Sequence, residues 1–264
     1  MSKNYLKLLE ESLPPPNHKM YNVWKHYALD AIKRGFVVKK ILSRFIDFSL
    51  GKILDVGCGE GGITIAFAKC TETDVCSVDI DRKRVYRSKV RAHEEGCVHV
   101  NFVIADGLWL PFRDGVFNVV ICNDLIEHVP KPNLLIKETY RVLEVGGIIY
   151  LSTPNKVSPL QIIRDGHYGL FALTLMPEKV AKWYVTKLRK IAISYDVYTL
   201  FTYWSLKKLL KTFNLKCSEP FEEYYISKVL SGLQSFLIKN RLLKPAVSRL
   251  FIPTFIFVCR KMEQ

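Results

Sequence analysis

An apolar segment that leads into a glycine-rich turn and then a helical pattern restricts the fold of this chain most strongly. Residues 53–56 have the character of a buried strand, and residues 57–62 read Gly-Cys-Gly-Glu-Gly-Gly before a helical pattern over 63–68. Glycines at such a junction let the backbone approach a ligand, with the helix N-terminal N–H groups pointing at it. The pattern also fits NAD and FAD sites, so it predicts a nucleotide-type ligand without identifying it.

Strand and helix patterns alternate along most of the chain. Predicted strands cover 52–56, 74–79, 98–104, 117–122, 147–153, 214–219 and 254–260. Predicted helices cover 62–70, 82–95, 131–143, 203–213 and 224–243. Such alternation predicts an α/β fold with a doubly wound, mostly parallel sheet that helices cover on both faces.

The segments that flank this pattern suggest a division into four parts. Residues 1–50 form a helical N-terminal extension, in which Pro14 to Pro16 separate a short first helix from a helical stretch over 19–48. Residues 154–202 lack the alternation, and a connection this long usually covers an active site. We therefore expect an extension (1–50), a ligand-binding core (51–153), a substrate-covering insertion (154–202) and a C-terminal part (203–264).

The net charge of +14 lies outside the predicted core. Residues 51–153 carry a net charge of −2, whereas 1–50 carry +5 and 154–264 carry +11. Basic residues accompany apolar stripes in segment 178–190 and in the predicted helix 224–243. Such faces suit a membrane surface or an anionic lipid-linked substrate, and ordinary core-packing helices with solvated lysines are the alternative.

Composition places the chain among globular proteins. Its residues are 49% hydrophobic and 24% charged, and no apolar run reaches the roughly 20 residues of a spanning helix. No N-terminal signal pattern appears, so we expect a cytoplasmic protein, with a peripheral position at a membrane as the alternative. Seven cysteines without a C-x-x-C pair predict buried thiols in a reducing compartment, and neither a zinc site nor a disulfide framework.

Polar residues mark the ends of four predicted parallel strands. Asp55 and Asp79 lie at the ends of the first and second, Asp106 follows the third, and Asn123 and Asp124 follow the fourth. Ligands of open α/β sheets bind at these carboxyl ends, and an acid about 20 residues past the glycines can accept hydrogen bonds from ribose hydroxyls.

Five motifs in this order resemble the class I S-adenosylmethionine-dependent methyltransferases. They are ILDVGCGEGG, VDID, IADGLWLPF, FNVVICNDLIEHV and RVLEVGGIIYLSTPN, within residues 50–155. The last two are similar to the branch with the ubiquinone-pathway O-methyltransferases and related "type 11" enzymes. The resemblance implies S-adenosylmethionine as cofactor and a Rossmann-like seven-stranded sheet with an antiparallel final strand.

The resemblance also implies a set of cofactor-binding residues. Asp55 would fix the glycine loop near the cofactor's ammonium group, Asp79 would hold the ribose hydroxyls, and Asp106 would accept from the adenine amino group. The alternatives are a helix cap for Asp55 and a turn residue for Asp106. The full predicted set is Asp55, Gly57, Cys58, Gly59, Asp79, Ile80, Asp106, Gly107, Asn123 and Leu125.

Methyl transfer from a sulfonium requires alignment and desolvation of the nucleophile, and a hydroxyl nucleophile gains from a base or a metal. We take Asp124, His128 and His167 as catalytic candidates, with a structural role at a helix start as the alternative for His128. Residues 124–128 are similar to the E-x-x-E-H metal motif of some O-methyltransferases, but Asp replaces the first Glu. We therefore assign no metal site, and keep Asp124, Glu127 and His128 only as metal candidates.

The predicted function is methyl transfer to oxygen of a small metabolite, quinone, glycan or lipid-linked substrate. An RNA or protein methyltransferase would use the basic flanks, but no N/D-P-P-Y/F motif follows the fourth strand, so nucleic acid is not favoured. A non-catalytic S-adenosylmethionine-binding or scaffolding protein is the alternative from another class. An NAD-dependent dehydrogenase accounts for neither the Asp106 motif nor residues 126–129. The acceptor atom and the oligomeric state stay open.

Overall fold

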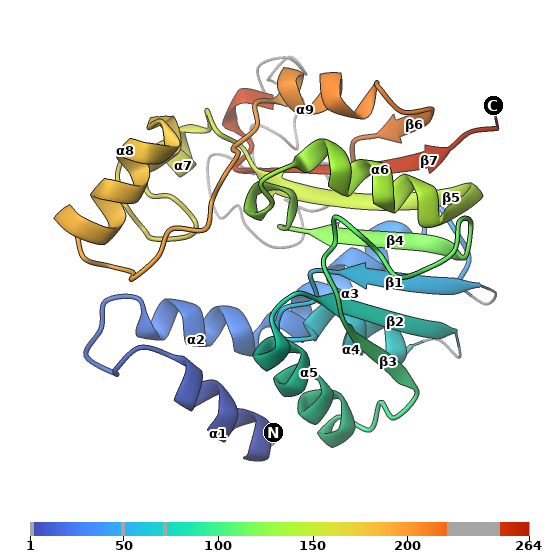
Figure 1. Cartoon of the computed structure of the whole chain (residues 1–264), viewed down its shortest axis with the longest axis horizontal. Coiled ribbons are helices and arrows are strands. Elements are labelled where there is room, and N and C mark those ends of the chain that lie inside the picture. Colours follow the sequence, from blue (N-terminus) through green and yellow to red (C-terminus); the bar gives the residue numbers. More distant parts are fainter. Residues whose placement is uncertain (1–2, 49–50, 71–72, 221–248, 264) are drawn as a thin grey trace, which may run out of the picture. The chain divides into compact units, whose positions relative to one another are not determined.

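The structure is a computed structural model that describes residues 3–48, 51–70, 73–220 and 249–263. Seven strands form one sheet in the order β3-β2-β1-β4-β5-β7-β6 (Figure 1). The sheet is mostly parallel, and within the described ranges its one antiparallel strand is the last, β7. The strands are β1 (Lys52–Val56), β2 (Asp74–Asp79), β3 (Val100–Ile104), β4 (Phe117–Asn123), β5 (Leu143–Pro154), β6 (Leu215–Ser218) and β7 (Thr254–Lys261). The predicted Rossmann-like fold with an antiparallel final strand is confirmed.

Helices precede the sheet, connect its strands and occupy the segment after β5. The α-helices are α1 (Lys3–Ser12), α2 (Tyr21–Leu29), α3 (Ala31–Leu42), α4 (Gly62–Ala68), α5 (Arg82–Glu94), α6 (Pro132–Val142), α7 (Pro159–Ile163), α8 (Glu178–Trp183) and α9 (Tyr203–Leu210). Shorter turns are η1 (Ile126–His128), η2 (Leu173–Leu175) and η3 (Tyr184–Leu188), of which η3 is a π-helix.

Most predicted boundaries agree with these elements, although β5 begins at Leu143 and not at the predicted residue 147. Two predicted helices differ in other ways. The helical stretch expected over 19–48 is divided at Asp30, which takes a non-helical conformation between α2 and α3. The helix expected over 224–243 lies outside the described residues. The division of the chain into four parts stays a prediction. None of the described helices is both long and apolar enough to cross a bilayer.

Two compact units make up the chain. The first comprises the described residues of Met1–Cys122, Leu134–Tyr150 and Arg260–Gln264. The second comprises those of Asn123–Asn133 and Leu151–Cys259. The first unit therefore holds the glycine loop and α1 to α5, and the second holds the segment after β5.

In the first unit, β1 pairs in parallel with β2 and with β4. Ile53, Leu54 and Val56 are buried, as expected for a strand that helices cover on both faces. Helix α3 packs closely on α4 through small residues. A Cβ built on Gly62 would lie 2.3 Å from the Ala31 Cβ, and one built on Gly35 would lie 2.6 Å from the Ala66 Cβ.

Gly62→Ala should therefore destabilise the protein. The added methyl would also lie 2.4 Å from the backbone carbon of Ala31, so a helix has to shift, and overpacking of this kind costs about 3 kcal/mol. Gly166→Ala is the matched control, because its methyl meets only the Gln161 side chain, at 3.5 Å or more. Urea unfolding measures both free energies, and equal stability of the two variants would contradict the packing described for α3 and α4.

In the second unit, buried polar side chains connect the segment after β5 to the residues before β7. The Asn155 amide donates to the carbonyl oxygens of Ile252 (2.8 Å) and Arg249 (3.0 Å). The Ser158 hydroxyl donates to the Phe251 carbonyl at 3.0 Å, and the Gln161 amide to the Pro253 carbonyl at 3.1 Å. These bonds satisfy backbone carbonyl groups of the residues that precede β7.

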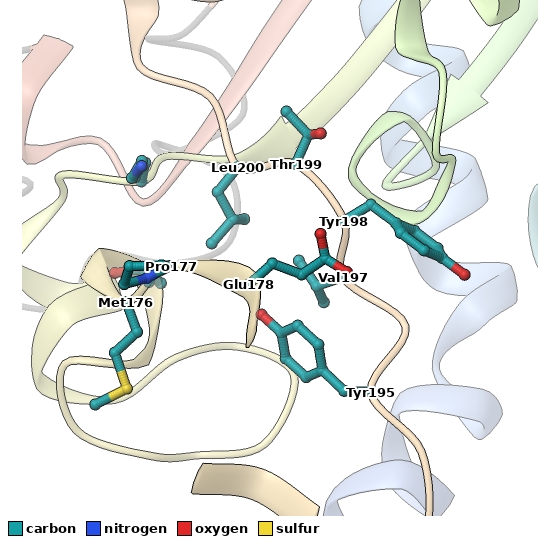
Figure 2. A pocket seen from close by; sticks show the side chains of 10 residues that line it. Met176, Pro177, Glu178, Tyr195, Val197, Tyr198, Thr199 and Leu200 are labelled. Carbon is teal, nitrogen blue, oxygen red and sulfur yellow. The ribbon is translucent and has the colours of Figure 1, made fainter. Parts of the chain in front are cut away.

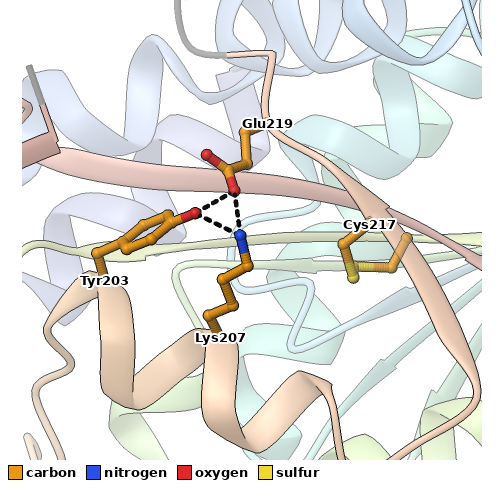
Figure 3. The surroundings of a disulfide bond; sticks show 5 residues. Tyr203, Lys207, Cys217 and Glu219 are labelled. Atoms are coloured by element: carbon orange, nitrogen blue, oxygen red, sulfur yellow. Dashed lines mark hydrogen bonds and ion pairs between the residues drawn. A yellow bond between two sulfur atoms is a disulfide. The ribbon is translucent and has the colours of Figure 1, made fainter. Parts of the chain in front are cut away.

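The expectation of free thiols is wrong for two of the seven cysteines. Cys217 on β6 and Cys259 on β7 form a disulfide bond, beside which Lys207 donates to Tyr203 Oη and contacts Glu219 (Figure 3). The expectation of burial also fails for Cys70, which is exposed. The two bonded residues are 42 positions apart and meet because β6 and β7 are neighbours in the sheet, which no sequence spacing shows.

Candidate active site

The glycine loop after β1 is held by bonds to the end of β2. The N–H groups of Gly57 and Cys58 donate to the Val78 carbonyl at 2.7 and 3.0 Å. Gly57, Gly59 and Gly61 all have positive φ angles, of 72°, 54° and 69°, which side chains would disfavour. A Cβ built on Gly59 would meet no atom within 4 Å, so there is open space beside this part of the loop.

Asp55 accepts hydrogen bonds from the first turn of α4, which follows the glycine loop. Its Oδ2 accepts from the Thr64 hydroxyl at 2.6 Å and from the Thr64 backbone N–H at 3.2 Å. The carboxyl is buried, and burial raises its pKa to about 6 against the opposing effect of these hydrogen bonds. The structure thus shows Asp55 in the helix-capping role that was the alternative to cofactor binding. The cofactor-binding role of Asp55 stays a prediction.

This raised pKa predicts a pH-dependent stability. The folded state retains the Asp55 proton between about pH 4 and about pH 6, where the unfolded chain has lost it, so the free energy of unfolding falls by about 3 kcal/mol as pH rises through this window. Asp55→Asn removes the charge and keeps an acceptor oxygen. The stability of this variant relative to the natural chain should therefore rise across the window.

Urea unfolding across this range measures the effect, with Asp74→Asn as the control, because Asp74 is exposed at the start of β2. If the stability of Asp55→Asn relative to the natural chain does not change with pH, the raised pKa of Asp55 is contradicted.

Asp79 connects the glycine loop to the turn after β2. Its Oδ2 accepts from the Gly59 N–H and its Oδ1 from the Asp81 N–H, both at 2.9 Å. The side chain is buried, whereas the neighbouring Ile80 is 70% exposed. Each carboxylate oxygen can accept a second hydrogen bond, so Asp79 keeps acceptor capacity for a ligand.

Asp106 forms a turn at the end of β3. Its Oδ1 accepts from the Leu108 N–H at 2.9 Å, and its Oδ2 has no hydrogen-bond partner among the described residues. Gly107 fits closely against the core, because a Cβ there would lie 3.0 Å from Val56. The first unit therefore contains a carboxylate at the end of each of its first three strands, together with the glycine loop, as predicted.

In the second unit, three of the predicted catalytic or metal-candidate residues come together. One ligand atom from each of Glu127, His128 and His167 lies within 4.8 Å of the others. The two imidazole rings meet edge to face with their centres 5.0 Å apart. His167 and His128 are 39 positions apart in the sequence, and the fold brings them to one place.

His128 is oriented by Asp196. Its Nδ1 lies 2.9 Å from the Asp196 carbonyl oxygen, which can only accept, so Nδ1 carries the proton and Nε2 is left as an acceptor. The Asp196 carboxylate lies 3.7 Å from the same Nδ1 and accepts from the Tyr168 hydroxyl at 2.7 Å. A base oriented by a third group in this way can take a proton from a nucleophile.

His167 and Glu127 are in a more buried environment. Burial, followed by the nearby His128, lowers the pKa of His167 to about 4, so its ring is neutral at pH 7. Burial raises the pKa of Glu127. Its Oε2 accepts from the Thr153 hydroxyl at 3.0 Å. Its buried Oε1 has no hydrogen-bond partner among the residues that the structure describes and lies 3.8 Å from His167 Nε2.

Asp124 is not part of this group. Its Oδ1 accepts from the Ser152 hydroxyl at 2.8 Å, and its Oδ2 from the Asn123 side chain at 3.1 Å. Its backbone has a positive φ of 51°, uncommon outside glycine. Asn123 and Leu125 lie on either side of it at the end of β4, partly exposed. The catalytic role predicted for Asp124 and the cofactor contacts predicted for its neighbours stay predictions.

A cavity of about 180 Å³ lies in the second unit (Figure 2). Its lining residues are Lys156, Thr174, Met176, Pro177, Glu178, Tyr195, Val197, Tyr198, Thr199 and Leu200. In the described part of the chain, the buried Thr174 hydroxyl has no hydrogen-bond partner. The N–H groups of Tyr198 and Thr199 donate to the Glu127 carbonyl at 2.8 and 3.3 Å, so the segment lining the cavity also supports the histidine pair.

Sequence reasoning missed the supporting residues of this site. Asp196 orients His128 from a position 68 residues away, and Thr153 bonds Glu127 from β5. No local pattern marks Asp196. Thr153 could have been suspected, because it lies in the motif RVLEVGGIIYLSTPN.

Comparison with known proteins gives a match over the part of the chain that holds the glycine loop, Asp79 and Asp106. Residues 54–151 match the family described as "Methyltransferase domain". The chain is 32% identical over 118 residues to Phosphoethanolamine N-methyltransferase 2 of Caenorhabditis elegans (44% of this chain, 27% of the relative). It is 33% identical over 106 residues to Ubiquinone biosynthesis O-methyltransferase of Thiobacillus denitrificans (40% and 45%). The chain thus matches less than half the length of each of these two relatives.

Solved structures show the same fold at low sequence identity. A SAM-dependent methyltransferase from Methanosarcina mazei aligns with a TM-score of 0.56 and 19% identity, over 85% of this chain and 98% of that one. At this identity the likeness supports the fold of the sheet and its helices and says nothing about the acceptor.

Proposed function

We propose that this chain, which belongs to the S-adenosylmethionine-dependent methyltransferases through residues 54–151, transfers a methyl group from S-adenosylmethionine to an oxygen atom of a small or lipid-linked acceptor. One observation carries the proposal. The matched residues include the glycine loop, Asp79 and Asp106, which lie at the carboxyl ends of β1, β2 and β3, where sheets of this type bind their ligands.

The residues of the first unit fit this cofactor. The space beside Gly59 is open, Asp79 keeps acceptor capacity beside the loop, and Asp106 Oδ2 has no partner in the part of the chain that the structure describes. When bound, the cofactor supplies an electrophilic methyl group on a sulfonium. The protein's task is then to hold the acceptor in line, to exclude water and to remove the acceptor's proton.

His128 is the group best suited to remove that proton. Its Nε2 is the free acceptor of a ring whose Nδ1–H is fixed on the Asp196 carbonyl, and the Asp196 carboxylate favours the imidazolium that forms. His167 suits this role less, because the lowered pKa makes its ring a poor proton acceptor at pH 7. A neutral His167 can still donate a hydrogen bond to an acceptor oxygen.

The cavity of the second unit is suited to hold the acceptor. An apolar cavity of roughly 150 Å³ accommodates benzene, so about 180 Å³ suits a ring-sized group. Val197 and Leu200 supply an apolar part, and the unpartnered Thr174 hydroxyl supplies a hydrogen bond. In Figure 2 the Glu178 carboxylate and the Tyr195 hydroxyl also point toward the middle of the lining.

The proposal can be tested with S-adenosylmethionine that carries an isotopically labelled methyl group. The protein is incubated with a cell extract, which is then separated into small-molecule, lipid, RNA and protein fractions. We expect label in a small-molecule or lipid product that is stable to base, as an ether is. Label only in RNA or protein would contradict the acceptor class. No transfer to any fraction, despite cofactor binding, would support the non-catalytic alternative.

A second role for the histidine pair is favoured by one specific observation. Within the described ranges, the buried Glu127 Oε1 has no hydrogen-bond partner and lies near two imidazoles, an arrangement that a divalent cation would satisfy. Such an ion would be held by Glu127, His128 and His167 and would lower the pKa of an acceptor hydroxyl.

Chelation separates the two roles. With a bound cation, dialysis against a chelator should abolish turnover and a divalent metal should restore it, while Glu127→Gln should bind the metal at least about tenfold more weakly. With His128 as a metal-free base, chelation should leave turnover unchanged. Metal analysis of the purified protein provides a readout that does not depend on activity.

A further inference from the structure

Residues 163–193 of the second unit expose many large apolar side chains. Seven of the 21 large apolar residues that are exposed in the described chain fall within these 31 positions. They are Ile163, Phe171, Leu175, Val180, Trp183, Leu188 and Ile193. Soluble proteins rarely expose apolar side chains at this density outside surfaces that bind something.

The helical stretch formed by α8 and η3 presents an aromatic residue between two lysines. It buries Ala181 and Val185, which are four positions apart and therefore lie on one face. Trp183 lies on the opposite face and is 54% exposed. Lys179 and Lys187, four positions before and after it, are exposed on the same side.

The charge of this surface is strongly positive. Residues 154–202 contain seven Lys or Arg and three Asp or Glu, one of which, Asp165, is buried. Six of the basic residues are exposed, namely Arg164, Lys179, Lys182, Lys187, Arg189 and Lys190. Within the ranges that the structure describes, none of these six forms an ion pair. Residues 163–193 therefore combine exposed apolar side chains with exposed cations that form no ion pair within the described ranges.

We propose that residues 163–193 dock the protein on the surface of an anionic lipid bilayer. Such a bilayer supplies negative headgroups for the lysines and arginines, and beneath them an apolar region for the exposed side chains. An indole flanked by ammonium groups suits the boundary between the two.

Other occupants match this surface less well. A second copy of the chain, with a net charge of +14, would set positive charge against positive charge. The chain's own residues 221–248 contain four Lys or Arg and only two Glu, so they have the same disadvantage. Single-stranded RNA would stack on Trp183 and Phe171, but it offers nothing to the aliphatic Ile163, Val180, Leu188 and Ile193.

Flotation of the full-length chain with vesicles tests the proposal. We expect the protein to float at low salt with vesicles of phosphatidylcholine and phosphatidylglycerol, and not with phosphatidylcholine alone. Each basic residue near such a surface contributes about fivefold in binding, so Lys179→Glu/Lys187→Glu should lower the partition coefficient at least about 30-fold. Trp183→Ala should lower it about tenfold.

Matched controls come from exposed residues of the first unit. Lys83→Glu/Lys89→Glu on α5 changes the net charge equally, and Trp109→Ala removes an indole that is 71% exposed. Both should float as the natural chain does. Absence of the natural chain from anionic vesicles, or equal losses in the controls, would overturn the proposal.

Two further results would also overturn it. One is tight binding to single-stranded RNA without binding to vesicles. The other is a dimer that Trp183→Ala dissociates and that does not float. None of these measurements involves turnover, so the proposal stands or falls separately from the methyltransferase activity.

Discussion

Asp79→Ala should weaken the binding of S-adenosylmethionine at least about 100-fold, because two charge-assisted hydrogen bonds of about 1.5–3 kcal/mol each are lost. The first is the bond to the Gly59 N–H, which holds the glycine loop at 2.9 Å. The second is the contact with the ribose hydroxyls that the family resemblance implies. The variant thus loses a ligand contact and the group that holds the loop in place.

Asp74→Ala is the matched control for this prediction. Asp74 begins β2, at the other end of the strand from Asp79, and is exposed. Its replacement should leave cofactor affinity unchanged. Thermal unfolding of both variants checks that they are folded. Equal affinity of Asp79→Ala and the natural chain for S-adenosylmethionine would contradict the assignment of this cofactor site.

His128→Ala should lower kcat by about 100- to 10,000-fold, the range expected when a general base is removed. The affinity for S-adenosylmethionine should change little, because the proposed role of His128 concerns the acceptor's proton. The fixed Nδ1–H and the Asp196 carboxylate are the reasons for expecting a base at this residue rather than at His167.

His99→Ala is the control, because His99 is exposed in the first unit. Asp196→Asn should give a smaller loss of kcat, since it keeps the carbonyl that orients the ring and removes only the negative charge. If His128→Ala and His167→Ala both turn over at near the natural rate, the general-base hypothesis fails.

The sequence predicted those parts of the fold that local patterns determine. Strand β2 has the predicted bounds, because apolar residues end at an acid that begins the next turn. The glycines of the loop were recognisable because their positive φ angles exclude most other residues. Asp55, Asp79 and Asp106 followed from the same rule, since each lies where a parallel strand ends.

Contacts between distant residues were not predictable in this way. Asp196 meets His128, and Cys217 meets Cys259, only because the folded chain brings separate segments together. The exposure of Trp183 was equally hidden, because a helix with apolar residues at this spacing more often packs into a core. Periodicity shows that a face is apolar, and tertiary packing decides whether it is covered.

Calorimetric titration of the natural chain with S-adenosylmethionine tests the central claim most directly, with NAD as the competing ligand. The account predicts saturable binding of one S-adenosylmethionine per chain and no heat with NAD. Binding of NAD, or no binding of S-adenosylmethionine by a folded chain, would contradict it.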